Sequence, residues 1–203
     1  QIGVPLSVWL LNEQTQVAVF EAGISKPGEM NALHDIIQPT IGVLTNLGAA
    51  HQENFASMEA KCKEKLQLFH DAKTIIYNAD DAVINKCVEE RDFKGEKIAW
   101  SEKDSKAPLY IKSIDKKDIT STVKYNYKGV ENEYSLPFID EASVRNSIIC
   151  AAVCLHLGVK PVQLKERMGR LEPVAMRLEV KEGQRGCTLI NDSYNSDINP
   201  LDI

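Results

Sequence analysis

Two chemically capable side chains, a carboxylate and an imidazole, lie at or just beyond the ends of apolar runs that are typical of buried strands. Glu21 ends the run Val17–Glu21, and His51 follows the run Ile41–Leu44 and a short polar loop. The carboxyl ends of parallel strands gather at one edge of a sheet, where ligands commonly bind. A carboxylate beside an imidazole suits a metal ion or a general base. From these residues alone, a capping role for Glu21 and a structural role for His51 are the default interpretations.

The third candidate is an amine, Lys65, on the apolar face of a predicted helix from Ser57 to about His70. The apolar stripe of this helix has helical spacing and consists of Met58, Cys62, Leu66 and Phe69. Lys65 falls within the stripe, whereas Lys61 at its margin and Lys63 on the opposite side are interpreted as solvated. Because an ammonium is costly to bury, Lys65 must reach out to water, pair with an anion or take part in chemistry. The periodicity leaves these three alternatives open.

The elements that would position these residues alternate between strands and helices. Strands are predicted at 17–21, 41–44, 74–77 and 98–100, and helices at 29–37, 57–70 and 82–90, the last one capped by the run Asn78–Asp81. This alternation predicts an α/β fold with a mostly parallel sheet and helices on both faces.

The pattern changes after Ser101. Apolar and polar residues alternate in the runs 109–114, 120–127 and 131–136, which predicts a small antiparallel section. Helices at 141–157 and 161–168 follow, then strands at 176–180 and 187–190. Trp9 and Trp100 are interpreted as packing residues, and His34, His70 and His156 as surface or core histidines.

Composition narrows the class of protein. The 203 residues have a net charge of −5, which disfavours an electrostatic nucleic-acid surface. No apolar run approaches the length of about 20 residues that a transmembrane helix needs, so we expect no membrane insertion. Five cysteines without a Cys-x-x-Cys pair indicate a reducing, cytoplasmic setting. The chain lacks an initiator Met and stops at a predicted helix start, Asn199–Ile203, so we expect a fragment.

Six segments of the sequence, taken in order, resemble the Mur ligase family. They are Glu21–Glu29, Thr45–His51, Lys65, Asn78–Asp81, Met176–Glu179 and Asn191–Asn195. Their order and spacing resemble the MurF type. The sequence around residues 52–55 and 64–66 is most similar to the bifunctional form, in which a MurF half is fused to an alanine racemase half. The resemblance implies an ATP-dependent ligase of peptidoglycan synthesis that joins D-alanyl-D-alanine to UDP-N-acetylmuramoyl-tripeptide through an acyl phosphate.

The resemblance also implies roles for individual residues. Glu21 and His51 match Mg²⁺ ligands of the family, and Lys65 matches its carbamylated lysine, with His51 and Lys65 as the catalytic pair. The remaining matched residues belong to the nucleotide and substrate site: Asn46 with Thr45 beside the metal, Asn146 near the adenine, and Arg177 and Asp192 near the phosphates and ribose. Residues 1–173 would be the central ATP-binding domain and residues 174–203 the start of the C-terminal ligase domain.

Three departures from the family pattern stand out. The sequence contains no Gly-x-x-Gly-Lys-Thr phosphate loop, so we expect the isolated fragment to be inactive. Ile149 occupies a position where the family usually has a second asparagine, and it cannot hydrogen-bond an adenine. The C-terminal domain is represented only by a short stretch.

Two other interpretations compete with the MurF type. One is a folylpolyglutamate synthetase-like ligase, which shares the architecture and the modified lysine. The other is a non-catalytic α/β scaffold whose polar loops are ordinary helix caps. A Gly-Lys-Thr loop encoded shortly upstream of Gln1 would favour a ligase over the scaffold.

Overall fold

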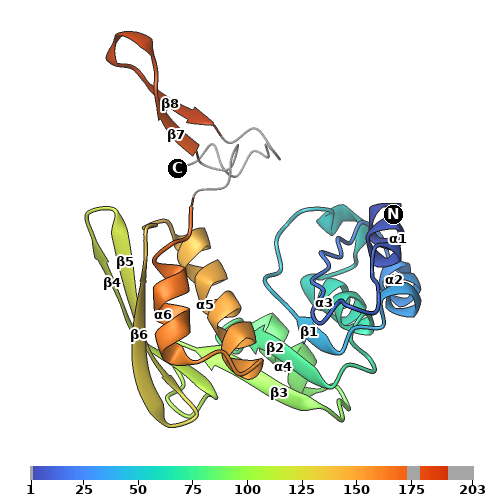
Figure 1. Cartoon of the computed structure of the whole chain (residues 1–203). Coiled ribbons are helices and arrows are strands. Elements are labelled where there is room, and N and C mark those ends of the chain that lie inside the picture. Colours follow the sequence, from blue (N-terminus) through green and yellow to red (C-terminus); the bar gives the residue numbers. More distant parts are fainter. Residues whose placement is uncertain (1, 173–178, 192–203) are drawn as a thin grey trace.

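The structure, a computed structural model, describes residues 2–172 and 179–191 (Figure 1). One six-stranded sheet forms its centre, with the strands in chain order: β1 (Ile41–Val43), β2 (Thr74–Asn78), β3 (Glu96–Ser101), β4 (Leu109–Lys117), β5 (Thr120–Tyr127) and β6 (Val130–Leu136). Strands β1 to β4 pair in parallel, and β4, β5 and β6 pair antiparallel. The predicted α/β class and its antiparallel section are therefore confirmed.

The antiparallel section is a continuation of the parallel sheet. Trp100 of β3 lies opposite Leu109 of β4, and both side chains are buried. From β4 onward the chain turns back on itself through short connections, which favour antiparallel neighbours because no crossover helix is needed. One hydrogen-bonded sheet thus runs from β1 to β6.

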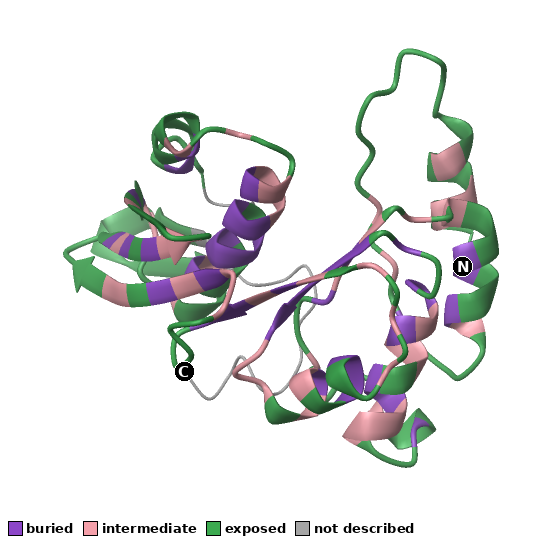
Figure 2. Cartoon of the chain, turned by 90° about the horizontal axis from the view of Figure 1, so that it is seen from below, coloured by how far each residue is buried: buried purple, intermediate pink, exposed green. Residues whose placement is uncertain are grey.

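Helices cover both faces of the sheet, which explains the uninterrupted burial of β2. Successive side chains of a strand point to opposite faces. Ile75 and Tyr77 pack in one core with α2 (Glu29–Ile37), α3 (Met58–Gln67) and α4 (Ala82–Glu89), whereas Ile76 packs in the other core with α5 (Glu141–His156) and α6 (Pro161–Met168). Figure 2 shows the buried residues concentrated on the inner side of α5 and along the central strands.

Local side-chain caps fix where three of these helices begin. Ser57 Oγ accepts a hydrogen bond from the backbone N–H of Ala60, and Asp81 and Asp140 cap α4 and α5 in the same way. Such caps satisfy backbone donors that have no partner within the helix. The predicted starts of the lysine-bearing helix and of α4 are confirmed.

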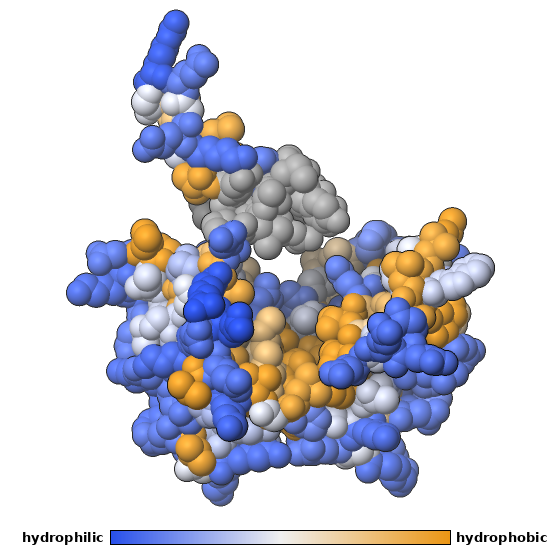
Figure 3. All heavy atoms as spheres, in the orientation of Figure 1, coloured by the Kyte–Doolittle hydropathy of each residue, from blue (hydrophilic) through white to orange (hydrophobic). Residues whose placement is uncertain are grey.

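The predicted strand Val17–Glu21 is wrong: this segment is irregular in the structure, and Val17 and Val19 are 63% and 89% exposed. A strand needs a hydrogen-bonded neighbour, and β1, the edge strand of the described sheet, pairs only with β2. A helix that the periodicity did not predict, α1 (Gly3–Trp9), precedes this segment. Apolar residues gather on the surface over α1 and the stretch after it (Figure 3). Trp9 is 82% exposed, so its interpretation as a packing residue is also wrong, whereas Trp100 is buried.

The last described elements are two short strands, β7 (Glu179–Glu182) and β8 (Thr188–Asn191), joined through the one-turn helix η2 (Gln184–Gly186). They pair antiparallel, close to the predicted strands at 176–180 and 187–190. Within the described part of the chain, every helix falls short of the length and apolarity that a membrane crossing requires.

Candidate functional site

The loop that leaves the carboxyl end of β1 carries the polar residues of the candidate site. Leu44 continues the strand direction, since it is buried and its N–H donates to the Ile76 carbonyl at 2.9 Å. Thr45 and Asn46 follow and are exposed. The chain therefore changes from core to solvent within two residues, at the edge where parallel strands present ligand-binding groups.

Lys65 is in contact with this loop. Its Nζ donates to the Asn46 carbonyl oxygen at 3.1 Å, and the residue is half-buried on α3. Burial lowers the pKa of Lys65, and the positive charge of Lys61 lowers it further. Both effects disfavour the charged amine, which is the condition under which a lysine nitrogen becomes nucleophilic.

Lys61 is the residue that sequence reasoning missed. Interpreted as solvated, it is instead 2% exposed and lies under the loop. Its Nζ donates to the Gly48 carbonyl at 2.8 Å and to the Ala50 carbonyl, and it faces the Phe55 ring at 5.9 Å from the centroid. The position of Lys61 at the margin of the apolar stripe was the one feature of the sequence that could have indicated its burial. Lys61 thereby joins α3 to the backbone that leads into His51. Lys63, in contrast, is exposed as predicted, and it forms an ion pair with Glu59.

His51 ends this anchored loop and begins the one-turn helix η1 (Gln52–Asn54). Its backbone has a φ of 58°, in the left-handed region, and its side chain is 53% exposed with Nδ1 at 4.0 Å from Glu53 Oε1. A left-handed backbone is uncommon for a residue other than glycine and marks a sharp change of chain direction. His51 therefore presents its imidazole at the surface of the loop, where it is accessible to a ligand.

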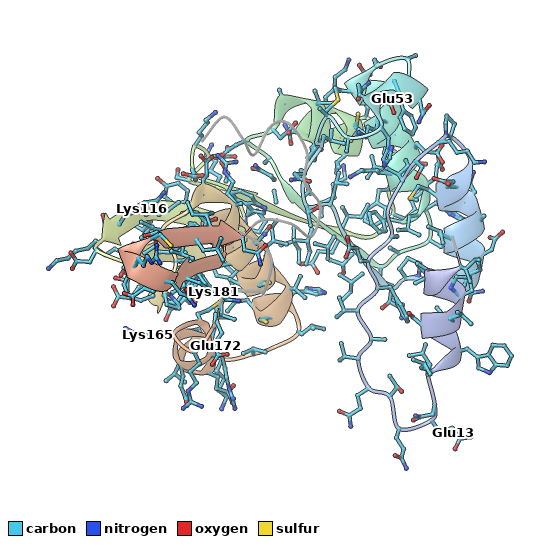
Figure 4. All side chains as sticks on the ribbon, turned by 90° about the horizontal axis from the view of Figure 1, so that it is seen from above. Glu13, Glu53, Lys116, Lys165, Glu172 and Lys181 are labelled. Atoms are coloured by element: carbon cyan, nitrogen blue, oxygen red, sulfur yellow. The ribbon has the colours of Figure 1, made fainter. Side chains whose placement is uncertain are left out.

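Glu21 lies in a neighbouring loop, but its side chain is separate from the others. Among the described residues, no hydrogen bond or ion pair links Glu21 to His51 or Lys65. The two loops are nevertheless tied together, because Asn54 Nδ2 donates to the Ser25 carbonyl at 2.9 Å. Figure 4 shows Glu53, the neighbour of Asn54, and Glu13 at opposite ends of this half of the molecule, so Glu13 lies away from the candidate site.

A second set of contacts ties the loop after Glu21 to α3. Glu64 Oε1 accepts from the backbone N–H groups of Gly28 and Met30 at 2.8 and 3.2 Å. These donors are the N-cap residue Gly28 and a residue in the first turn of α2, where a carboxylate is favourable both as a hydrogen-bond acceptor and toward the helix dipole. Helix α3 thus holds the loop after β1 through Lys61 and the start of α2 through Glu64.

The run Asn78–Asp81 at the end of β2 has a structural role. Asp81 caps α4, and Asp80 accepts from Ser101 Oγ at 2.5 Å and from the Glu102 N–H at 2.7 Å. Asn78 Oδ1 accepts from the Asp80 N–H. These bonds fix the carboxyl ends of β2 and β3 relative to each other.

The remaining predicted site residues lie on another helix or outside the described part of the chain. Asn146 is exposed on α5, and Ile149, one turn further, is buried in the core. Arg177 and Asp192 lie outside the described residues. The structure therefore brings together Asn46, Lys65 and the loop that ends at His51, and it leaves Glu21 adjacent through its loop.

The donor set at this edge is chemically mixed. With Lys65 as an amine, the edge offers positive charge and N–H donors, which suit an anion. Glu21 and His51 offer one carboxylate and one imidazole, fewer oxygen ligands than a hard cation such as Mg²⁺ prefers. A carboxylate added to the Lys65 nitrogen would reverse its charge and supply the missing oxygens.

Comparison with known proteins identifies relatives of the whole chain. The family described as the Mur ligase middle domain matches residues 1–154. The UDP-N-acetylmuramoyl-tripeptide–D-alanyl-D-alanine ligase of Bacillus subtilis is 26% identical over 96% of this chain, and the protein of the same name from Borreliella burgdorferi is 31% identical over 97%. This chain spans 42% of the length of each. A crystal structure of MurF from Acinetobacter baumannii superposes over 98% of this chain and 44% of its own, with a TM-score of 0.81 at 20% identity.

Proposed function

This chain belongs to the Mur ligase family, and we propose that it is the central part of an ATP-dependent ligase that joins D-alanyl-D-alanine to UDP-N-acetylmuramoyl-tripeptide in peptidoglycan synthesis. The named relatives match nearly the full length of the chain and support this activity. The observation that carries the proposal is the contact of Lys65 with Asn46 at the carboxyl edge of β1. An amine with a lowered pKa, held on the loop that leads to His51, is what the proposed chemistry requires.

The reaction has two steps. A carboxylate oxygen of the peptide stem attacks the γ-phosphorus of ATP, an O–P bond forms, and ADP leaves. The amine of D-alanyl-D-alanine then attacks the acyl carbon, a C–N bond forms, the C–O bond to phosphate breaks, and the amine loses a proton. Both steps build negative charge on oxygen atoms, which cations and fixed N–H donors stabilise.

We propose that Lys65 works as a carbamate. Its neutral nitrogen attacks carbon dioxide, an N–C bond forms, and the nitrogen loses a proton, so a cation becomes an anion. The lowered pKa of Lys65 raises the neutral fraction of the amine at a given pH and so favours this step. With Glu21 and His51, the carbamate would complete a donor set for Mg²⁺, which supplies positive charge to the phosphate oxygens when bound.

Other residues have proposed roles in binding and orientation. Asn46 orients substrate beside the metal, Asn146 lies near the adenine, and Arg177 and Asp192 contact the nucleotide. We propose residues 1–173 as the central domain and 174–203 as the start of the C-terminal domain, in a cytoplasmic enzyme. Because the sequence around residues 52–55 and 64–66 is similar to the bifunctional form, we propose that the full protein is fused to an alanine racemase. The sequence of the full gene tests this proposal.

The test of the ligase proposal uses the full-length protein. Phosphate release from ATP should require both UDP-N-acetylmuramoyl-tripeptide and D-alanyl-D-alanine. Lys65→Ala should lower kcat by about 10²-fold or more, and a short carboxylic acid in the buffer should restore part of the activity by replacing the carbamate. The matched control is Lys63→Ala, on the exposed side of the same helix, which should retain activity.

The same variants separate the ligase from a scaffold. A protein that binds partners without catalysis would release no phosphate with any substrate pair. Full activity in Lys65→Ala would refute the role of Lys65, and the ligase assignment would then be supported by the named relatives alone. Labelling with ¹³C-bicarbonate should give a carbamate carbon signal in the wild type that is missing in Lys65→Ala.

A further inference from the structure

A cluster of three metal-ligating side chains lies outside the site described above. His34 belongs to the last turn of α2, and His70 and Asp71 belong to the turn that follows α3. His34 Nε2 and His70 Nε2 lie 3.6 and 3.1 Å from the same oxygen, Asp71 Oδ2. The two imidazole rings are 3.6 Å apart between centroids, and one ligand atom from each residue lies within 4.8 Å of the others. Residues far apart in the sequence thus converge on one point.

Backbone contacts select the form of both imidazoles that can bind a metal. His34 Nδ1 lies 3.2 Å from the Leu68 carbonyl oxygen, and His70 Nδ1 lies 3.1 Å from the Gln67 carbonyl oxygen. A carbonyl oxygen only accepts hydrogen bonds, so Nδ1 is the donor in each contact and carries a proton. In a neutral ring the lone pair is then on Nε2, and this second contact through Nδ1–H is the usual arrangement of metal-binding histidines.

In that neutral form, the two Nε2 atoms and the Asp71 carboxylate oxygen are three lone-pair donors that lie close together. Two nitrogen lone pairs and a carboxylate oxygen repel unless a positive charge lies between them. Bonds of about 2.0–2.1 Å at tetrahedral angles place neighbouring ligand atoms about 3.3 Å apart. The two separations between an Nε2 atom and Asp71 Oδ2, 3.1 and 3.6 Å, bracket that value, and one ligand atom from each of the three residues lies within 4.8 Å of the others.

The surroundings favour a fixed site with an open side. The His34 side chain is 9% exposed, whereas those of His70 and Asp71 are 41% and 76% exposed. The turn that carries His70 and Asp71 is anchored where Lys73 N–H donates to the Thr40 carbonyl at 2.9 Å, at the entry to β1. The cluster therefore lies at the amino end of β1, opposite to the end that carries Asn46 and Lys65.

We propose that His34, His70 and Asp71 bind a divalent transition-metal ion such as Zn²⁺, with water in the open coordination position. Imidazole and carboxylate ligands suit Zn²⁺ and its neighbours in the transition series better than Mg²⁺. The bound ion would connect the end of α2 to the turn between α3 and β2. This site is independent of the proposed ligase activity.

The experiment measures zinc binding by the full-length protein after removal of metals by a chelator. Titration calorimetry with zinc chloride, in buffer that holds saturating Mg²⁺, should show one saturable site in the wild type. His70→Gln and Asp71→Asn, both at exposed side chains, should weaken this binding by at least about tenfold. The matched control is His156→Gln, because His156 also lies beside a carboxylate, Glu96 at 3.7 Å, but has no second imidazole.

A spectroscopic readout excludes binding by the exposed cysteines Cys150 and Cys187. Cobalt bound by nitrogen and oxygen ligands shows visible d–d bands without the near-ultraviolet band of a cobalt–thiolate bond. Circular dichroism of the variants verifies their folding, and zinc should raise the melting temperature of the wild type more than that of His70→Gln. The proposal is overturned if the wild type shows no saturable zinc site, which is the result expected of a cluster that binds only a proton. It is also overturned if zinc binding survives in both variants, or if bound cobalt shows the thiolate band.

Discussion

The buried ammonium of Lys61 gives the sharpest test of how α3 holds the loop before His51. We consider Lys61→Met, which keeps an unbranched apolar stem and removes the group that donates to the Gly48 and Ala50 carbonyl oxygens. The substitution should release residues 48–51 from the helix while leaving α3 itself packed.

The expected loss follows from the contacts. A hydrogen bond from a charged donor contributes about 1.5–3 kcal/mol. Gly48 and Ala50 are exposed, so water can replace the lost donor, and the variant also avoids the desolvation of a buried ammonium. We therefore expect a net loss of about 2 kcal/mol, closer to one such bond than to two. Lys63→Met, at an exposed residue of the same helix, should change stability by no more than about 0.5 kcal/mol.

Two assays separate a local from a global effect. Urea unfolding of both variants gives the free energy of unfolding, and hydrogen exchange of the amides at 48–51 reports opening of the loop. The reasoning is refuted if Lys61→Met matches Lys63→Met in stability and the loop amides exchange as in the wild type.

The same substitution should affect Lys65. The positive charge of Lys61 lowers the pKa of Lys65, so its removal should raise that pKa toward the ordinary value. Carbamate formation requires the neutral amine, and its pH midpoint should therefore move upward in Lys61→Met. The ¹³C-bicarbonate signal recorded against pH measures this midpoint, and an unchanged or lower midpoint would contradict the electrostatic coupling.

Three further predictions concern packing, acid stability and activity. A Cβ at Gly42 would overlap the Phe69 ring, so Gly42→Ala should destabilise the protein by about 1–3 kcal/mol in urea unfolding. Gly48→Ala is the control, because a Cβ at Gly48 has open space around it and should be tolerated. Equal stabilities of the two variants would disprove the clash. The Tyr77 hydroxyl donates to Glu89 at 2.8 Å and lowers the pKa of Glu89 below its ordinary value of 4.5. The ionised Glu89 carboxylate therefore stabilises the folded protein above pH 4.5, and this stabilisation is lost as the pH falls through the lowered pKa. The stability difference between wild type and Glu89→Gln should accordingly shrink between pH 7 and pH 3.5, and a constant difference would argue against this linkage. The 203-residue chain assayed alone should release no phosphate from ATP with both substrates, because it contains no Gly-x-x-Gly-Lys-Thr loop; sustained release would show that another segment binds the phosphates.

Local signals in the sequence predicted most elements well. Helix α2 begins at Glu29 and ends at Ile37 as predicted, because a glycine-rich loop precedes it and Pro39 follows it. Ser57 and Asp81 are caps in the structure because their side chains reach backbone donors within the next turn. Strands β5 and β6 follow from the alternation of apolar and polar residues around a Lys-Gly turn.

The wrong predictions for residues 17–21 and for Lys61 have the same cause: both depend on contacts with other segments of the chain. The run 17–21 has the composition of a strand, but pairing depends on a neighbour, which composition does not specify. Periodicity placed Lys65 inside the apolar stripe and Lys61 at its margin, yet Lys61 is the more deeply buried of the two. Its burial depends on a loop that returns over α3 and presents two carbonyl oxygens.

The sequence by itself determined the class of fold and the order of the elements, because caps, turns and periodicity act between residues close in the chain. It also singled out Glu21, His51 and Lys65 as candidates. Only the tertiary structure decided which lysine anchors the loop, that Lys65 lies on Asn46, and that His34 meets His70 and Asp71. Those contacts join residues far apart in the chain, and their geometry depends on how the helices pack against the sheet.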